Sequence, residues 1–464
     1  MQFRRQKMRN FVQFRTIFLA GFIFFSYLCG KFQKLPIGMK NLKRILESQR
    51  DELKVLDVSA LCTRKEEQEI QLNSNLAQVV IGVRRSGKST LCQKVLIEKG
   101  VNFAYANFDD ERLKKAKTED LDDILQMLYE IYGDFTHLFL DEVQNVKDWP
   151  LFVNRLLRQK MRLIITGSNA NLLSGELATH LTGRYHKIEL YPFSFAEMCQ
   201  MGKVDMVSGS VKAIGLRQHE LAKYIMEGGF PELIVEPETN RHDYLQSLLK
   251  AIIEKDICKR YKVRYKKTLS ELANKMLDWF CQEKSYNDIT EELGIQSVHT
   301  TKNYIEYLQN AYLLYILPKF SLKSKEKTMA RKAYAIDPAF IDEHDQALLT
   351  ESYGLRLENV IALEIARRIN SDYEQLYYLR KDREFEVDFV VVERSHVKEL
   401  IQVTYDFSNP SEKLFKREVE GLTRGSALTH CDNLTLIVMY GETGTIEHDG
   451  KKIRVVSAAD WLVG

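Results

Sequence analysis

The sequence predicts an α/β protein with a doubly wound parallel sheet, followed by further domains. Apolar, β-rich segments alternate with helical ones from about residue 77 to residue 190, which is typical of strands joined by right-handed helical crossovers. One of these strands leads into a glycine-rich loop that opens a helix. At 464 residues the chain is about three times as long as a typical domain, so we expect two to four domains.

The composition is that of a globular protein from a reducing compartment. Hydrophobic residues make up 45% of the chain and charged residues 28%, both near globular averages. The seven cysteines are scattered and never spaced C-x-x-C, which argues against a disulfide framework and against a zinc site. We therefore expect a cytoplasmic location.

The net charge of +3 conceals an uneven distribution. The residues before Met39 carry seven basic side chains and no acidic one, so the rest of the chain has a net charge of −4. Any binding to nucleic acid must therefore come from local patches and not from bulk charge.

Residues 1–38 also contain an apolar run, Thr16 to Gly30, behind their basic start. The pattern resembles a signal peptide or a short anchor, but the run is shorter than the ~20 apolar residues that a membrane span needs. Met39 then opens a polar helical stretch. We interpret residues 1–38 as an upstream extension or a mis-assigned start, with a weak anchor as the alternative, and expect no membrane association.

The loop in "VVIGVRRSGKST" matches the pattern G-x4-G-K-S that cradles phosphates,. Such a loop presents backbone N–H groups at a helix N-terminus, where they converge on phosphate oxygens. Lys88 would neutralise β- and γ-phosphate charge, and the Ser89 hydroxyl would bind Mg²⁺. The residues expected to contact a nucleoside triphosphate here are Gly82, Val83, Arg84, Arg85, Ser86, Gly87, Lys88, Ser89 and Thr90.

A second apolar strand ends in two acids, Asp141 and Glu142, in "THLFLDEV". In phosphoryl transfer a carboxylate at this place holds the Mg²⁺ shell and the next one polarises the attacking water. A strand that merely ends in two acids is common, but the glycine-rich loop lies about fifty residues upstream, which is the expected distance. We therefore predict that Asp141 binds Mg²⁺ with Ser89 and that Glu142 is the catalytic base.

Two further groups have either a catalytic or a merely structural interpretation. The strand in "MRLIITGSNANLL" ends in small polar residues, of which Ser168 or Asn169 could sense the γ-phosphate, or could simply close a turn,. Arg184 could act as a catalytic arginine finger on a neighbouring subunit, or could form a surface ion pair. The finger role would require a homo-oligomer.

These motifs resemble one family, the bacterial and archaeal AAA-type ATPases that carry a C-terminal domain of unknown function related to restriction-endonuclease-like folds. The resemblance spans roughly residues 56 to 406 and rests on "GVRRSGKST", "NFDDERL", "LFLDEVQNV", "TGSNANLLSGELATHLTGRYHKIELYPFSFAEM", "GGFPE", "LENVIALEI" and "EVDFVV". It implies an α/β P-loop NTPase that binds ATP, in preference to GTP, with Mg²⁺ and hydrolyses it.

After the ATPase domain the pattern becomes helical and then resembles a winged helix-turn-helix. The order helix, short helix, glycine turn, longer helix and strand runs from about residue 267 to residue 336,. The candidate DNA contacts at its recognition helix are Ser297, His299, Thr300 and Lys302,. The basic stretch Lys319 to Lys332 would be the wing. The alternative is that this module packs against protein and that the basic stretch is only solvated surface.

The C-terminal part of the chain resembles the core of a PD-(D/E)xK nuclease in which one required residue is replaced. Glu358 (or Glu364), Asp388 and Gln402 would occupy the metal positions, but Thr404 stands where the catalytic lysine is required,. Threonine cannot supply the positive charge that stabilises a pentacovalent phosphate. We therefore expect a degenerate site and a structural or docking role.

The predicted domains are residues 1–38 (extension), 39–200 (AAA-type ATPase), 201–266 (helical lid), 267–336 (winged helix) and 337–464 (nuclease-like domain). The leading functional hypothesis is a Mg²⁺-dependent ATPase that acts as a switch or motor on a nucleic-acid or protein target. The alternative is a DNA-binding or partner-binding regulator that a nucleotide stabilises with little turnover. A nuclease and a membrane-anchored ATPase are the remaining hypotheses.

Overall fold

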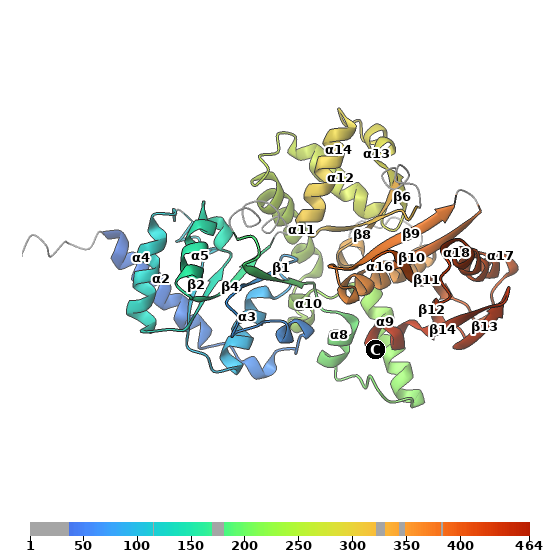
Figure 1. Cartoon of the computed structure of the whole chain (residues 1–464), viewed down its shortest axis with the longest axis horizontal. Helices are drawn as coiled ribbons and strands as arrows, with labels where there is room; N and C mark the ends of the chain where they lie inside the picture. Colours follow the sequence, from blue (N-terminus) through green and yellow to red (C-terminus); the bar gives the residue numbers. More distant parts are fainter. Residues whose placement is uncertain (1–36, 115, 169–180, 322–329, 343–348, 382–383) are drawn as a thin grey trace, which may run out of the picture.

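The computed structural model describes residues 37–464, except 115, 169–180, 322–329, 343–348 and 382–383. Within these ranges no helix is long and apolar enough to cross a membrane. The apolar run Thr16 to Gly30 lies outside the described residues. Three sheets divide the chain, and Figure 1 shows them in sequence order from the blue N-terminal part to the red C-terminal part.

The first sheet consists of five parallel strands in the order β2-β3-β4-β1-β5. The strands are β1 (Ala77–Gly82), β2 (Phe103–Asn107), β3 (His137–Asp141), β4 (Arg162–Gly167) and β5 (Tyr185–Leu190). Every residue of β1 and β3 is buried, as expected for a parallel sheet that is covered on both faces. The predicted α/β core with a parallel sheet is confirmed.

Helices cover both faces of this sheet because successive strand residues point to opposite sides. Apolar residues of α3 (Lys88–Glu98) pack with Val80 and Phe139 on one face. Apolar residues of α2 (Ile37–Leu53), α4 (Asp120–Tyr132) and α5 (Trp149–Arg158) pack with the alternate strand residues on the other face. The sheet therefore presents its carboxyl edge, where β1, β3 and β4 end, to the parts of the chain that follow.

The middle of the chain is mainly helical and contains a small antiparallel sheet. Its helices are α8 (Phe195–Met201), α9 (Val211–Glu227), α10 (Pro231–Val235), α11 (Arg241–Ala251), the π-helical segment η4 (Ile252–Cys258), α12 (Lys266–Asp278), α13 (Tyr286–Glu292) and α14 (Val298–Asn310). The strands β6 (Glu283–Ser285), β7 (Leu314–Pro318) and β8 (Ala330–Ala335) form a sheet in the order β6-β8-β7. Chain order is thus helix, strand, helix, helix, strand, strand from α12 to β8.

The last part contains a six-stranded mixed sheet in the order β13-β14-β12-β11-β10-β9. Its strands are β9 (Glu374–Lys381), β10 (Phe385–Glu393), β11 (His396–Asp406), β12 (Leu434–Tyr440), β13 (Gly444–His448) and β14 (Lys451–Ser457). Helix α16 (Leu349–Arg368) packs on one face and α18 (Gly421–Thr429) on the other. The short helices α15 (Ala339–Asp342), α17 (Glu412–Phe415) and α19 (Ala458–Val463) complete this part.

One hydrophobic cluster runs through all three parts and holds them together. It includes Ile81 of the first sheet, Leu272 of α12 and Ile361 of α16. The C-terminal helix α19 also returns to α9, where Asp460 Oδ1 lies 2.9 Å from Arg217 Nη2. The three parts therefore share one hydrophobic core.

Candidate functional site

The glycine-rich loop wraps the N-terminus of α3, and its two glycines have conformations that other residues would strain. Gly82 has φ of +142°, and a Cβ there would lie 1.9 Å from the backbone oxygen of Leu190 on β5. Gly87 has φ of +91° and immediately precedes the helix. Glycine at both positions lets the backbone turn sharply, so that the N–H groups of the first helical turn face the loop, as a phosphate-binding site requires.

Lys88 is buried and folds back over the loop. Its Nζ donates hydrogen bonds to the carbonyl oxygens of Val83 (2.8 Å) and Gly82 (3.3 Å). Burial lowers the pKa of Lys88, against the nearby charges of Glu142 and Asp141. The ammonium therefore sits inside the loop, where it could reach phosphate oxygens.

Ser89 and Asp141, the predicted Mg²⁺ ligands, are in direct contact. The Ser89 hydroxyl donates to Asp141 Oδ1 over 2.8 Å, although the two residues lie 52 positions apart in sequence. The Asp141 carboxylate also accepts hydrogen bonds from the hydroxyls of Thr166 and of Tyr105, the latter over 3.1 Å. Burial raises the pKa of Asp141, while these three hydroxyls counter the rise. A Mg²⁺ ion usually takes one or two carboxylates besides phosphates and waters, and this donor set fits it.

Glu142 follows in the left-handed conformation, with φ of +53°. Its backbone N–H donates to Thr166 Oγ1 over 3.0 Å, and its carboxylate accepts from the Gln144 side chain. Burial raises the pKa of Glu142 to about 7, against the opposing charge of Lys88. A carboxylate with such a pKa can exchange a proton near neutral pH.

These groups line a cavity of about 590 Å³. Besides the loop, Asp141 and Glu142, its walls include Cys62, Phe193 and Met201, and Pro231, Glu232 and Val235 of α10. The wall opposite the phosphate-binding loop thus includes residues of the predicted lid, 201–266. The quoted segment GGFPE contains Pro231 and Glu232, whereas no sequence motif identified Cys62.

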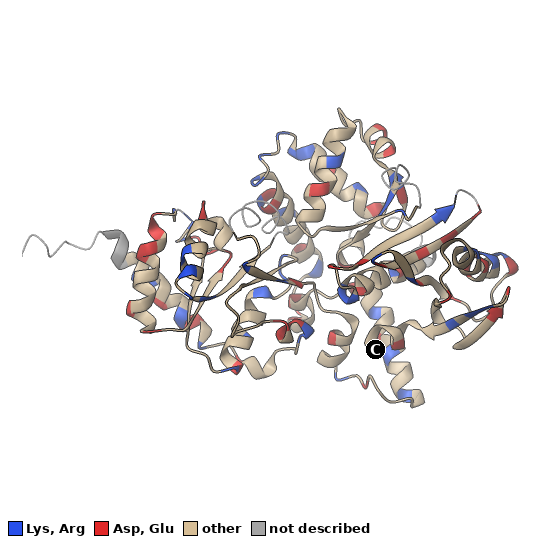
Figure 2. Ribbon diagram, viewed as in Figure 1, with Lys and Arg blue, Asp and Glu red and all other residues tan. Residues whose placement is uncertain are grey.

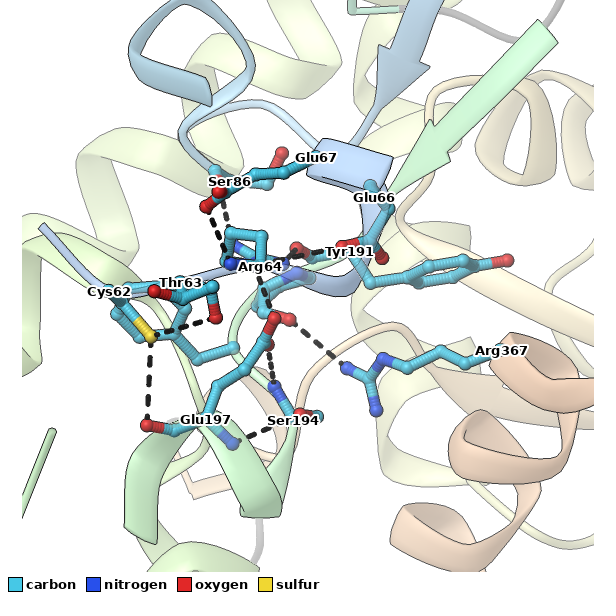
Figure 3. Close-up of polar contacts among 12 residues, drawn as sticks. Cys62, Thr63, Arg64, Glu66, Glu67, Ser86, Tyr191, Ser194, Glu197 and Arg367 are labelled. Atoms are coloured by element: carbon cyan, nitrogen blue, oxygen red, sulfur yellow. Dashed lines mark hydrogen bonds and ion pairs between the residues drawn. The ribbon is translucent and has the colours of Figure 1, made fainter. Parts of the chain in front are cut away.

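Arg64 is a buried residue of this cavity that the sequence did not reveal (Figure 3). Its guanidinium donates to the backbone oxygens of Ser86 (3.3 Å) and Tyr191 (2.8 Å), and to Glu197 Oε1 (2.5 Å). Arg367 of α16 lies beside this cluster and donates to the Pro192 backbone oxygen over 3.2 Å. Arg64 therefore fixes the position of the phosphate-binding loop relative to the segment before α8.

The remaining residues predicted for this site are placed as follows. Ser168 is buried just after β4, with its hydroxyl 3.4 Å from Asp256 Oδ1, whereas Asn169 lies outside the described residues. Arg184 is exposed, and its Nη1 donates to Asn154 Oδ1 over 2.7 Å. Thr166, two residues before Ser168, is the β4 residue that contacts both Asp141 and Glu142. Its place in the sequence, a polar residue next to the carboxyl end of an apolar strand, was the signal that could have identified it.

The candidate DNA contacts lie at the start of α14. Ser297 caps the helix by accepting a hydrogen bond from the Thr300 N–H over 3.2 Å. His299 and Lys302 are exposed, and Thr300 is partly exposed. Figure 2 shows basic and acidic residues interspersed along the described part of the chain.

The residues of the nuclease-like motif converge, but around an ammonium group that the sequence did not predict. Lys332 of β8 places its Nζ 3.0 Å from Glu358 Oε1, 2.8 Å from Glu386 Oε1 and 3.9 Å from Asp388 Oδ1. Burial alone would lower the pKa of Lys332, but these carboxylates raise it well above its ordinary value. The stretch Lys319 to Lys332 was expected to form the wing, with solvated surface as the alternative. Lys332 is only 4% exposed, so for this residue the solvated-surface alternative is wrong.

The other polar groups of this cluster are also hydrogen-bonded. Gln402 accepts from the Asp388 N–H (3.1 Å) and donates to Glu418 Oε2 (2.7 Å), and Asp388 Oδ2 accepts from the Val403 N–H (2.9 Å). Thr404 is buried two residues further along β11. Glu364, the alternative helix carboxylate, pairs with Arg367 and Arg368 instead.

The cluster does not fit a metal ion. Among the described residues no group of three or more His, Cys, Asp or Glu side chains is arranged to hold one. The Lys332 ammonium already lies among the carboxylates that a nuclease metal would need. The degenerate nuclease site stays a prediction, which rests on Thr404 in the place of the catalytic lysine.

Comparison with known protein families identifies two domains. An AAA domain matches residues 74–199, and a domain of unknown function matches residues 218–345. A domain of unknown function after the ATPase domain, as the sequence resemblance implied, is therefore confirmed, although the matched residues fall in the predicted lid and winged helix.

The chain is also similar to proteins of archaea and bacteria. An uncharacterized protein of Methanocaldococcus jannaschii is 31% identical over 408 residues, which cover 85% of this chain and 89% of that protein. An uncharacterized protein of Haemophilus influenzae is 30% identical over 405 residues, covering 84% and 95%. Among solved structures, the Walker-type ATPase of Pyrococcus abyssi matches 61% of this chain and 95% of its own, with 15% identity and a TM-score of 0.40.

We expect Lys332→Met to destabilise the protein by about 3 to 5 kcal/mol, because it leaves buried carboxylates without their counter-charge. The measurement is the urea midpoint of the unfolding transition, followed by circular dichroism. The matched control is Lys416→Met, which breaks an exposed pair with Glu412 in the last part of the chain and should move the midpoint little. Equal midpoints for the two variants would contradict a buried ion-pair network at Lys332.

Proposed function

Because the chain belongs to the same family as these archaeal and bacterial proteins and carries an AAA domain, we propose that it hydrolyses ATP with Mg²⁺ and uses the reaction as a switch or motor. The observation that carries the proposal is the 2.8 Å contact between Ser89 and Asp141. It joins the phosphate-binding loop to the acidic end of β3, with Glu142 beside them in the same cavity.

Each residue has a defined task in this reaction. The loop N–H groups and Lys88 hold the phosphates, and Ser89 and Asp141 would hold Mg²⁺, which neutralises charge that develops on the γ-phosphate. Glu142 accepts a proton from the water that attacks the γ-phosphorus, while the bond from phosphorus to the bridging oxygen of ADP breaks. Thr166 keeps the backbone of Glu142 and the carboxylate of Asp141 in a fixed relation.

The rest of the chain would transmit the change. We assign residues 39–200 to the ATPase domain, 201–266 to a lid, 267–336 to a winged helix and 337–464 to a degenerate nuclease fold. The lid assignment is supported by Pro231, Glu232 and Val235 in the cavity wall. The exposed Arg184 would complete the site of a neighbouring subunit in a homo-oligomer.

The target class favoured by the element order from α12 to β8 is nucleic acid. In this arrangement α14 is the recognition helix, and the exposed His299 and Lys302 would contact phosphates,. A protein target is the alternative, and the exposed surface of α14 could bind it.

The first test is Mg²⁺-ATP turnover with two variants of the site. Glu142→Gln should bind ATP as tightly as the wild type but turn over about 10² to 10⁴ times more slowly, because the general base is lost. Lys88→Ala should lose ATP binding. Lys99→Ala, at the exposed end of α3, is the control that should leave both quantities unchanged. Full turnover in Glu142→Gln would contradict the assigned base.

The pH dependence of turnover offers an independent test. Since burial raises the pKa of Glu142 to about 7, its basic form is half populated near that pH and falls about tenfold for each pH unit below it. We expect kcat/KM for ATP, which reports titration in the free protein, to rise from pH 6 to pH 8 and then level off. The residual rate of Glu142→Gln should lack this rise, and a flat wild-type profile would exclude Glu142 as the titrating base.

Coupling to nucleic acid can be tested with duplex and single-stranded DNA in the turnover assay. We expect DNA to increase the rate, and the double variant His299→Ala, Lys302→Ala to bind DNA more weakly with a shallower salt dependence. Lys267→Ala, a highly exposed lysine on α12, is the charge-matched control. Turnover that does not respond to DNA would favour a protein target.

A further inference from the structure

We propose that Asp256 competes with the γ-phosphate for Arg84, and thereby reports ATP binding to the domain of unknown function. The inference rests on the proposed function, since it names how the same site is regulated. Asp256 lies within residues 218–345, which match that domain, whereas Arg84 belongs to the phosphate-binding loop of the AAA domain. A charged contact between the two therefore crosses from one domain to the other.

The position of Asp256 is set by the π-helical segment η4, which continues α11. A π-helix has a wider turn than an α-helix and is frequent at functional sites, because it redirects a side chain. Ile253 and Ile257 on either side of Asp256 are buried in the main hydrophobic cluster. Asp256 itself is only 7% exposed and faces the phosphate-binding loop.

Asp256 is held there by weak contacts. Its Oδ1 lies 3.4 Å from Arg84 Nη1 and 3.4 Å from the Ser168 hydroxyl, both longer than a strong charge-assisted hydrogen bond of about 2.7 to 2.9 Å. Its Oδ2 has no hydrogen-bond partner among the described residues. The contact with Arg84 is therefore weak, and a stronger acceptor can displace Asp256 from it, which leaves the carboxylate with fewer partners.

Arg84 is well placed to change partner. It lines the cavity together with Lys88, and its second nitrogen lies 3.9 Å from Asp109 Oδ2 on the rim. A guanidinium forms strong bidentate contacts with phosphate. The γ-phosphate of ATP would therefore displace Asp256 from Arg84. ADP has no γ-phosphate and would leave the pair intact.

The consequence is a nucleotide-specific change outside the AAA domain. When Arg84 turns to the γ-phosphate, Asp256 loses its main counter-charge, and the remaining positive groups that act on it are Arg260 and Lys88. The segment η4 then loses its charged contact with the loop, and its amides become less protected, while Ile253 and Ile257 stay packed in the main hydrophobic cluster. After hydrolysis the Arg84–Asp256 contact forms again.

The experiment measures Mg²⁺-ATP and Mg²⁺-ADP dissociation constants of the full chain for Asp256→Asn. We expect the variant to bind ATP about tenfold more tightly, within the usual range for coupled sites, and ADP with unchanged affinity. Glu254→Gln, an exposed acid on the same π-helical segment, is the matched control and should change neither constant. Equal changes for ATP and ADP, or none, would overturn the inference.

A second measurement uses the wild-type chain and does not depend on the variant folding. Hydrogen exchange of the amides in residues 252–258 should accelerate with ATP bound and not with ADP bound, and identical exchange in the two states would overturn the inference. If the wild type turns over ATP but the affinity ratio and the exchange stay constant, only the role of Asp256 fails. If the wild type binds no ATP, the proposed function fails with it.

Discussion

The parallel alignment of β1, β3 and β4 is the constraint on which the candidate site depends. Because neighbouring parallel strands end at the same edge of a sheet, the loop after β1, the acids after β3 and Thr166 of β4 meet although they are far apart in sequence. The hydrogen bonds of Asp141 to Ser89, Thr166 and Tyr105 then fix one geometry at that edge. Any shift in strand register would separate these groups.

Buried charges connect this edge to the rest of the molecule. Arg64 ties the phosphate-binding loop to Tyr191 and Glu197, and Arg367 of α16 contacts the same segment. Each guanidinium is hydrogen-bonded to backbone oxygens, which gives directional contacts that hydrophobic packing lacks. The parts of the chain are therefore held in a defined orientation at the very place where a nucleotide would bind.

The sequence predicted the phosphate-binding wall of the cavity, because the loop spacing is local and the Asp141–Glu142 pair follows an apolar strand. It did not predict Arg64, Asp256 or Lys332, since each acts through a contact with residues more than twenty positions away. Lys332 was assigned to the wing of a winged helix, with solvated surface as the alternative, because it ends a lysine-rich stretch. Only the tertiary structure brings its side chain to the carboxylates that the nuclease-like motif had already identified.

The ion cluster around Lys332 also constrains how the chain can be divided. The ammonium belongs to β8, whereas Glu358, Glu386 and Asp388 come from α16 and β10. A cut between β8 and α16 would place the cation in one fragment and the anions in the other, and would expose these groups to water. A fragment that encodes either region alone would lack the counter-charge that neutralises this cluster, and could bury its charged groups only at the cost of unpaired charge.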